Sequence, residues 1–329
     1  IRKLRLVNGN FVLHITSCVQ YKTTIEQIFT PLEQITKPIP NMKNIKPLLF
    51  GLMLFLSFSC SVTKNQKKGA VVPQNFNFEI EFTTAKSVII LPFEIDGISK
   101  NFLFDTGADY SLIQRDSTSG KTGNYDGASN RKMKLGTEYV KSMKIGNIEF
   151  QNTFAGNGNF EGLKEQVPNF GGLIGQPIIN KANWLIDYPN KTLRISSKKL
   201  VDNTFQTIQI KREHGAPYTF ISINGIEHKV IIDFGSSSEF NLPKESKLAK
   251  QLLQQYEFDD NERDRYTLGG IQTIKEKVGI VPLIRLGNME FENVNTTLNI
   301  SSQPRIGIGF FKDCEIYIDN LNNSYKIKK

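Results

Sequence analysis

Apolar and polar residues alternate over short stretches of this chain, and turn-forming residues separate the stretches every ten to fifteen positions. Residues 76–82 show the pattern most clearly, with an apolar side chain at every second position. Alternation of this kind predicts half-buried strands. We expect further strands at 88–95, 102–104, 139–145, 184–186, 218–223, 230–232, 278–286 and 315–318. Many short strands at such spacing are typical of an all-β sandwich or barrel.

Helical periodicity is rare in the sequence. Pro243 is placed to open one helix over 244–256, with Leu248, Leu252 and Leu253 on one face. A few shorter helices are expected, for example directly after Gly175. The chain is therefore predicted to be almost entirely β.

The pattern of the first half recurs in the second. Residues 95–108 and 223–236 each contain an apolar residue, a turn pair, a polar stretch and an apolar strand that ends at an Asp. The turn pairs Asp96-Gly97 and Asn224-Gly225 are hairpin dipeptides. Three later segments match in the same order: 145–152 with 286–293, 173–175 with 307–309, and 184–187 with 316–319. An internal duplication of this length predicts two related lobes, each of which supplies one carboxylate, Asp105 or Asp233.

Charge is distributed unevenly. Residues 1–68 contain ten Lys or Arg and two Glu, which leaves 31 basic and 30 acidic residues in the remainder. A nucleic-acid-binding domain needs a basic face, so the composition gives no support to that function class. The basic N-terminal stretch is better explained as a processing signal.

Residues 42–59 resemble a bacterial lipoprotein signal peptide. A cationic start at 42–46 precedes an apolar run at 48–58, which is too short to span a bilayer as a helix, and Cys60 follows as the expected lipidated residue. The run departs from the usual pattern because Leu56 lies one position further from the Cys and Phe58 is bulky. An ordinary secretory signal or a membrane-anchored N-terminus therefore stays open.

This reading divides the chain into five segments. Residues 1–41 are expected to precede the true start, 42–59 to be the signal peptide and 60–75 a tether. Residues 76–200 and 201–329 are expected to form the two lobes. The resemblance implies a cell-envelope protein anchored by lipid in the outer membrane, with its periplasmic or surface face left open.

The repeated strings resemble the signatures of the pepsin-like and retropepsin-like aspartic peptidases. Residues 103–108 match the apolar-apolar-Asp-Thr-Gly-Ala motif, and 173–175 match the apolar-apolar-Gly segment that threads beneath the first Asp loop. Asp233 and 307–309 repeat this pair. The resemblance covers 75–329 and implies a bilobal acid-protease fold of two β-barrel-like lobes. It also implies that Asp105 and Asp233 are catalytic, with Gly175 and Gly309 in the threading segments.

Two carboxyl groups held close together share one proton, because both cannot ionise. The ionised group can activate water as a general base while the protonated group donates to the carbonyl oxygen. The loop residues expected to support them are Thr106, Gly107, Ala108, Phe234, Gly235 and Ser236. The family has Thr or Ser directly after each Asp, whose hydroxyl bonds to the opposite loop. Phe234 departs from that pattern, so half of this lock is expected to be missing.

The loop sequences also predict an asymmetric pair of acids. Ser236 is placed to hydrogen-bond Asp233, whereas Ala108 at the matching position has no hydroxyl to offer Asp105. We therefore expect Asp233 to ionise more readily and Asp105 to hold the shared proton.

The resemblance further implies a hairpin flap over the site. The Gly-rich stretch 120–127 is the candidate, with Tyr125 and Gly127 near its tip, and 268–270 is its counterpart in the second lobe. An ordinary surface loop is the alternative interpretation of 120–127.

These expectations define an envelope-anchored aspartic endopeptidase that acts as a monomer on an extended peptide or protein and needs no cofactor or metal. One alternative is a catalytically inactive peptide- or protein-binding lipoprotein on the same fold, with Phe234 as the cause of inactivity. A structural β-rich lipoprotein is a second alternative.

Overall fold

The computed structural model describes residues 4–7, 10–13, 61–126, 132–213 and 215–329, and its contacts separate 1–58 from 59–329. The expected signal peptide, Cys60 and Gly127 lie outside the described residues. In the N-terminal part, β1 (Leu4–Val7) pairs with β2 (Asn10–Leu13) in an antiparallel hairpin. Within the described ranges, no helix has both the length and the apolar content needed to cross a bilayer.

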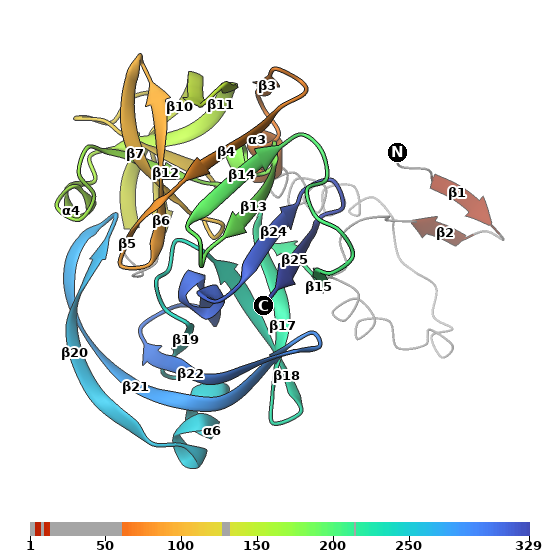
Figure 1. Ribbon diagram of the computed structural model, residues 1–329, viewed down its shortest axis with the longest axis vertical. Helices are drawn as coiled ribbons and strands as arrows, with labels where there is room; N and C mark the ends of the chain where they lie inside the picture. Colours follow the sequence, from red (N-terminus) through yellow and green to blue (C-terminus); the bar gives the residue numbers. More distant parts are fainter. Residues whose placement is uncertain (1–3, 8–9, 14–60, 127–131, 214) are drawn as a thin grey trace, which may run out of the picture. The chain divides into compact units, whose positions relative to one another are not determined.

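The described residues from 61 to 329 form an all-β, bilobal fold, as the sequence predicted (Figure 1). The first lobe is built on a nine-stranded sheet in the order β3-β11-β8-β12-β7-β6-β10-β9, with β5 paired to β6. Its strands are β3 (Ala70–Val72), β5 (Thr83–Ala85), β6 (Val88–Ile95), β7 (Ile98–Phe104), β8 (Ser111–Gln114), β9 (Gly123–Asp126), β10 (Lys132–Ile145), β11 (Ile148–Gly158) and β12 (Phe170–Ile174).

The second lobe repeats this arrangement in an eight-stranded sheet with the order β16-β17-β18-β23-β19-β22-β21-β20. Its strands are β16 (Lys211–Glu213), β17 (Ala216–Ile223), β18 (Ile226–Asp233), β19 (Phe240–Pro243), β20 (Phe258–Thr267), β21 (Gly270–Leu286), β22 (Met289–Asn299) and β23 (Arg305–Gly307). The parallel pair β7–β12 of the first lobe corresponds to β18–β23, and the parallel pair β8–β11 corresponds to β19–β22. The two lobes therefore share the strand pairings that an internal duplication predicts.

A six-stranded sheet takes three strands from each half of the chain. Its order is β15-β25-β24-β13-β14-β4, with β4 (Asn77–Glu81), β13 (Asn183–Asp187), β14 (Thr192–Ser196), β15 (Gln206–Gln209), β24 (Glu315–Asp319) and β25 (Ser324–Lys328). The halves meet where β13 pairs with its own repeat, β24, and Leu185 lies opposite Tyr317. Because these two residues occupy the same position of the repeat, an approximate two-fold axis passes between them.

The hairpin turns form as their residues predicted. Asp96 and Gly97 have φ values of 54° and 75°, and Asn224 and Gly225 have values of 51° and 78°. Positive φ at both central positions is the requirement of the two-residue type I′ hairpin turn, and Asp, Asn and Gly tolerate it. The turns fix the register of the strands that lead to the two Asp residues.

Helices are short: α3 (Ser61–Gln66), α4 (Glu161–Lys164), α5 (Gln176–Ile179), α6 (Lys247–Gln255) and the 3₁₀ turn Ile308–Phe311. The helix predicted over 244–256 begins later than expected. Pro243 ends β19, and Ser246 caps α6 by accepting a hydrogen bond from the backbone of Ala249. Leu248 and Leu252 are buried, but Leu253 is 39% exposed, so it does not belong to the packed face.

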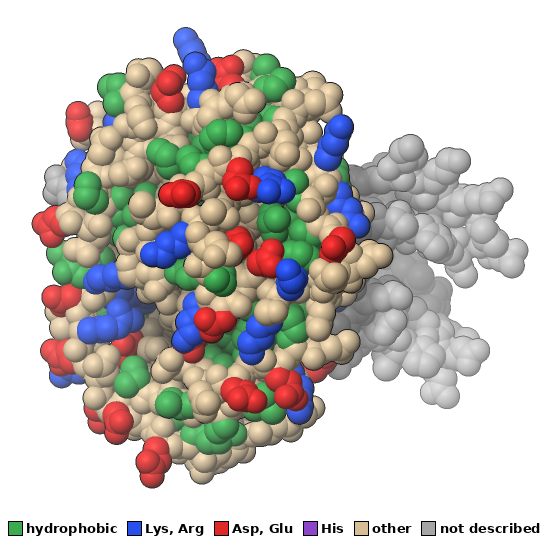
Figure 2. Space-filling view, viewed as in Figure 1, with side chains coloured by type: hydrophobic (Ala, Val, Ile, Leu, Met, Phe, Trp, Pro, Cys, Tyr) green, Lys and Arg blue, Asp and Glu red, His purple; other side chains and the backbone are tan. Residues whose placement is uncertain are grey.

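One hydrophobic core runs through both lobes and the shared sheet, from Phe76 to Ile327. A smaller cluster in the first lobe contains Val88, Leu112, Phe160 and Leu173. Lys and Arg side chains are interspersed with Asp and Glu on the face drawn in Figure 2, as the near balance of charge after residue 68 suggests.

Candidate active site

Each repeat delivers its Asp at the end of a central strand. Asp105 follows β7, and its backbone N–H donates to the carbonyl of Ile174 at 3.0 Å. Asp233 is the last residue of β18 and pairs with Gly307 of β23. The paired strands place both carboxyl groups at the same end of their lobes, where the two lobes meet.

The two Asp loops face each other across the junction. A Cβ atom on Gly107 would lie 2.8 Å from the Cγ of Asp233, and one on Gly235 would lie 2.5 Å from Oδ2 of Asp105. Real side chains do not occupy such space, so only glycine allows this approach at either position. The structure therefore brings together the two Asp residues that the repeat singled out.

Both carboxylates are also bound by their own loops. The N–H of Gly107 donates to Oδ1 of Asp105 at 2.8 Å, and that of Gly235 donates to Oδ1 of Asp233 at 3.1 Å. These matching bonds orient the two acids in the same way.

Thr106 makes the cross-lobe hydrogen bonds that its sequence position predicted. Its hydroxyl donates to the carbonyl of Ile232 at 2.8 Å and accepts from the N–H of Phe234 at 3.0 Å. Gln176 adds a bond from its side-chain amide to the Thr106 carbonyl at 2.6 Å. The hydrogen bonds between the two Asp loops thus come from the hydroxyl of the first lobe alone.

Phe234 fills the place where the second lobe would carry the matching hydroxyl. Its side chain is fully buried and packs against Phe311, with ring centroids 5.6 Å apart, and against Tyr325 at 6.3 Å. Phe234 therefore lacks the hydroxyl but packs tightly in the hydrophobic core beneath the site.

Asp233 has a partner that the sequence analysis missed. Nη1 of Arg305 lies 2.5 Å from Oδ2 of Asp233, and both side chains are about nine-tenths buried, at 10% and 8% exposure. The expected bond from Ser236 is wrong, because the Ser236 hydroxyl pairs with that of Ser238 at 2.7 Å. The buried guanidinium therefore gives the Asp233 carboxyl group a charge-assisted hydrogen bond.

Asp105 has the opposite environment. Burial, followed by the nearby Asp233, raises the pKa of Asp105 well above its usual value, and a hydrogen bond with Asp233 acts in the same direction. That Asp233 ionises more readily than Asp105 stays a prediction. The contact that distinguishes the two acids is the one between Arg305 and Asp233, and not a bond from the hydroxyl of Ser236.

The register of the second threading segment also needs correction. Cβ atoms on Gly175 would press on the carbonyls of Ala108 and Tyr110, the third and fifth residues after Asp105. Gly307 meets the equivalent carbonyls of Ser236 and Ser238. Gly307 and not Gly309 is therefore the counterpart of Gly175, although Gly309 still lies against the same loop.

This register explains why Arg305 was missed. With Gly307 matched to Gly175, Arg305 occupies the position of the buried Leu173. The sequence did contain a signal for this contact, namely a charged residue at a position where the first lobe has an apolar one. The alignment of Gly309 with Gly175 concealed it, because Arg305 then had no apolar counterpart.

The candidate flap is part of a hairpin. Tyr125 lies on β9, opposite Met133 of β10, and its ring contacts that of Tyr110. The connecting residues, with Gly127, lie outside the described ranges. The role of this hairpin as a flap stays a prediction.

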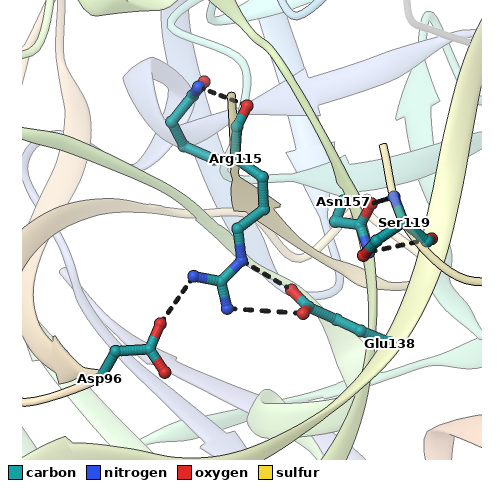
Figure 3. Close-up of polar contacts among 6 residues, drawn as sticks. Asp96, Arg115, Ser119, Glu138 and Asn157 are labelled. Carbon is teal, nitrogen blue, oxygen red and sulfur yellow. Dashed lines mark hydrogen bonds and ion pairs between the residues drawn. The ribbon is translucent and has the colours of Figure 1, made fainter. Parts of the chain in front are cut away.

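Polar contacts tie the base of this hairpin to the lobe, as Figure 3 shows. Arg115 binds Asp96 at 2.6 Å and Glu138 of β10 at 3.2 Å. The side-chain oxygen of Asn157 accepts from the N–H of Ser119 at 2.8 Å. The described part of the hairpin is therefore fixed at its base.

The second lobe has a longer hairpin at the position that corresponds to the candidate flap. Strands β20 and β21 form a long hairpin whose tip, Leu268-Gly269, was expected from the sequence. A pocket of about 370 Å³ lies between this tip and Met133–Leu135 of the first hairpin. A larger pocket of about 480 Å³ lies elsewhere, beside α3 and the shared sheet, and neither Asp lines either pocket.

Comparison with known proteins adds no family assignment. A scan against protein-family models found no match to the chain, and a search of curated proteins found none either. The functional argument accordingly depends on the residues and geometry described above.

The raised pKa of Asp105 leads to an expectation about pH. A general acid works only while protonated, and a raised pKa keeps the Asp105 proton in place to higher pH. If the site hydrolyses peptides, the falling limb of the kcat/KM profile is expected well above pH 3.8, the usual value for Asp. A pH–rate profile checks this, and a falling limb at or below pH 3.8 would contradict it.

Proposed function

We propose that this protein is an aspartic endopeptidase that hydrolyses peptide bonds with Asp105 and Asp233. The observation that carries the proposal is the facing pair of Asp loops, each closed by a glycine against the opposite carboxyl. Few structural roles require two acids to be buried against each other, since close carboxylates repel unless one holds a proton.

The environments assign a role to each acid. Asp233, whose carboxyl group is paired with Arg305, is the general base that takes a proton from the attacking water. Asp105, whose raised pKa preserves its proton, donates to the carbonyl oxygen as the tetrahedral intermediate forms. Each carboxylate oxygen accepts more than one hydrogen bond, so the bonds from Gly235 and Arg305 leave Asp233 able to bind water.

Substrate access requires motion. Asp233 is only 6% exposed, and hairpins from both lobes flank the site. An extended peptide reaches the carboxyl groups when the contacts between the tip of the β20–β21 hairpin and the first lobe open, as lids do in many enzymes. The lipid anchor at Cys60 and the outer-membrane location complete the proposal and depend on the sequence resemblance alone.

A second function is favoured by one specific contact. Arg305 occupies Oδ2 of Asp233, and a carboxylate held by a guanidinium is a weaker base. With Phe234 in place of a hydroxyl residue, this contact also suits a catalytically inactive peptide-binding protein on the same fold.

Digestion of a mixed peptide library separates the two functions. The full chain is incubated with the library between pH 3 and 7, and products are identified by mass spectrometry beside the Asp105→Asn chain. Internal cleavage by the parent and none by the variant supports the peptidase. Peptide retention by both chains without new termini selects the binding protein, and neither cleavage nor retention rejects both.

A further inference from the structure

The β20–β21 hairpin connects the two lobes next to the candidate active site. It leaves the second lobe near α6 and extends to α4 of the first lobe, as Figure 1 shows in light blue. At its tip, Gly270 lies so close to Gly162 that a Cβ on Gly162 would overlap it. Tyr266 and Leu268 pack against the small hydrophobic cluster of the first lobe. The hairpin is thus held at both ends.

The hairpin has one outward and one inward face. Glu262 and Lys275 lie opposite each other on the outward face and are exposed. The cross-strand pairs Asn261–Glu276 and Arg265–Gln272 lie on the inward face, because they alternate with the outward pairs. Of the polar and charged side chains in these two pairs, that of Glu276 is buried and the other three are partly buried.

Arg263 and Arg265 lie on this face of the hairpin, and Arg305 of β23 interacts electrostatically with Arg265; two of these three arginines have a carboxylate partner. Glu276 is almost fully buried and accepts from Nε of Arg263 at 2.5 Å, and Asn299 also donates to it. Arg305 pairs with Asp233. Arg265 has no such partner: its Nη1 is buried and has no hydrogen-bond partner among the described residues.

Two further polar atoms in this region are also buried without a hydrogen-bond partner in the described part of the chain. They are Oε1 of Gln272, directly across the hairpin from Arg265, and Nε of Arg305. Burial lowers the pKa of Arg265, repulsion from Arg305 and Arg263 adds to this, and Asp233 acts in the opposite direction. Arg265 therefore lies within electrostatic range of Arg305 and of the candidate catalytic Asp233.

Unpaired guanidinium N–H groups in a buried position carry an unrecovered desolvation cost. A carboxylate matches the planar fork of arginine and removes that cost through charge-assisted hydrogen bonds. The amide of Gln272 can complete the contact through its N–H₂ group after a simple rotation. The arrangement thus has the features of a binding site whose acceptor comes from another molecule.

We propose that Arg265, with Gln272 and the free Nε of Arg305, forms a subsite that binds a carboxylate of the bound peptide beside Asp233. The proposal is an extension of the proposed function, because it names the substrate class of that site. The carboxylate has two possible sources, an internal Asp or Glu side chain or the C-terminus of the peptide, and both present the same chemistry to Arg265.

Peptide binding to the full chain carrying Asp105→Asn tests the subsite without turnover. Fluorescently labelled peptides selected from library sequences are compared as matched pairs, Glu against Gln at each internal position and free acid against amide at the C-terminus. Fluorescence anisotropy is expected to show about tenfold tighter binding of the carboxylate member of one pair. The pair that shows it identifies the source.

Variants on the two faces of the hairpin show whether Arg265 causes the preference for carboxylate peptides. Arg265→Gln is expected to abolish the preference, whereas Lys275→Gln, which removes the same charge from the outward face, is expected to keep it. Equal binding of both members of every pair would overturn the proposal, and so would a preference that survives Arg265→Gln. If Arg265→Gln does not fold, the comparison of paired peptides on the Asp105→Asn chain still decides between these outcomes.

Cleavage of the same peptides by the parent chain separates this proposal from the peptidase itself. Carboxylate-selective binding without cleavage would support the subsite and reject the peptidase. Cleavage of acidic and neutral peptides at equal kcat/KM would support the peptidase and overturn the subsite.

Discussion

Asp105→Asn and Asp233→Asn are expected to abolish peptide cleavage equally and to change stability in opposite directions. Each substitution removes one of two groups that act together, so each is expected to reduce kcat/KM by about 10³-fold or more, with little further loss in the double variant. Loss of activity alone does not distinguish the two acids. The change in the free energy of unfolding distinguishes them, because the two substitutions are expected to change it in opposite directions.

Asp233→Asn leaves Arg305 buried without its counter-ion. Breaking a buried pair by removing one partner costs about 3 kcal/mol, because the remaining charge is uncompensated. Asp105→Asn removes a group whose pKa is raised in the folded protein. Above pH 3.8 the unfolded chain releases this proton while the folded chain retains it, so parent stability falls as pH rises towards the folded pKa. The Asn variant is expected to be the more stable one at pH 7, with the difference vanishing below pH 3.8.

Urea denaturation between pH 3 and 7 measures both effects, and Asp116→Asn, at an exposed position, serves as the control. A destabilised Asp105→Asn chain at pH 7, or an Asp233→Asn chain as stable as the parent, would contradict the assignment of proton and charge to the two acids.

Phe234→Thr is expected to weaken the protein and not to repair the missing half of the lock. Threonine would supply the absent hydroxyl, but it would leave a cavity between Phe311 and Tyr325. Large-to-small changes at fully buried aromatic positions cost about 3 kcal/mol or more. Thermal and urea unfolding check the loss.

Phe220→Thr is the matched control, because Phe220 is 43% exposed on β17 of the same lobe and is expected to cost far less. If Phe234→Thr unfolds at the same urea concentration as the parent, the phenylalanine does not anchor the core as described.

The strands and turns could be predicted because their signals are local. Asp96-Gly97 and Asn224-Gly225 specify their turns through backbone preferences, and alternating side chains specify the strands that follow. The repeat then predicted that two acids meet, since equivalent strands in equivalent lobes end at equivalent places.

The partners of those acids could not be predicted in the same way. Arg305 reaches Asp233 through the register of β23 on β18, and the repeat was aligned two residues too late at that strand. Arg265 lies within the charged stretch 258–267, which has no apolar alternation to show which residues turn inward. The bond expected from Ser236 failed because a neighbouring serine, Ser238, competes for its hydroxyl.

The exchange of Leu173 for Arg305 at equivalent positions has an evolutionary consequence. In an assembly of two identical subunits, any substitution near one acid appears near the other as well, so both must share every task. Fusion of the copies in one chain removes that constraint, and here one lobe has an aliphatic neighbour where the other has a cation. If the two acids act in hydrolysis as proposed, their different roles are therefore fixed by the sequence and do not have to be established each time a substrate binds.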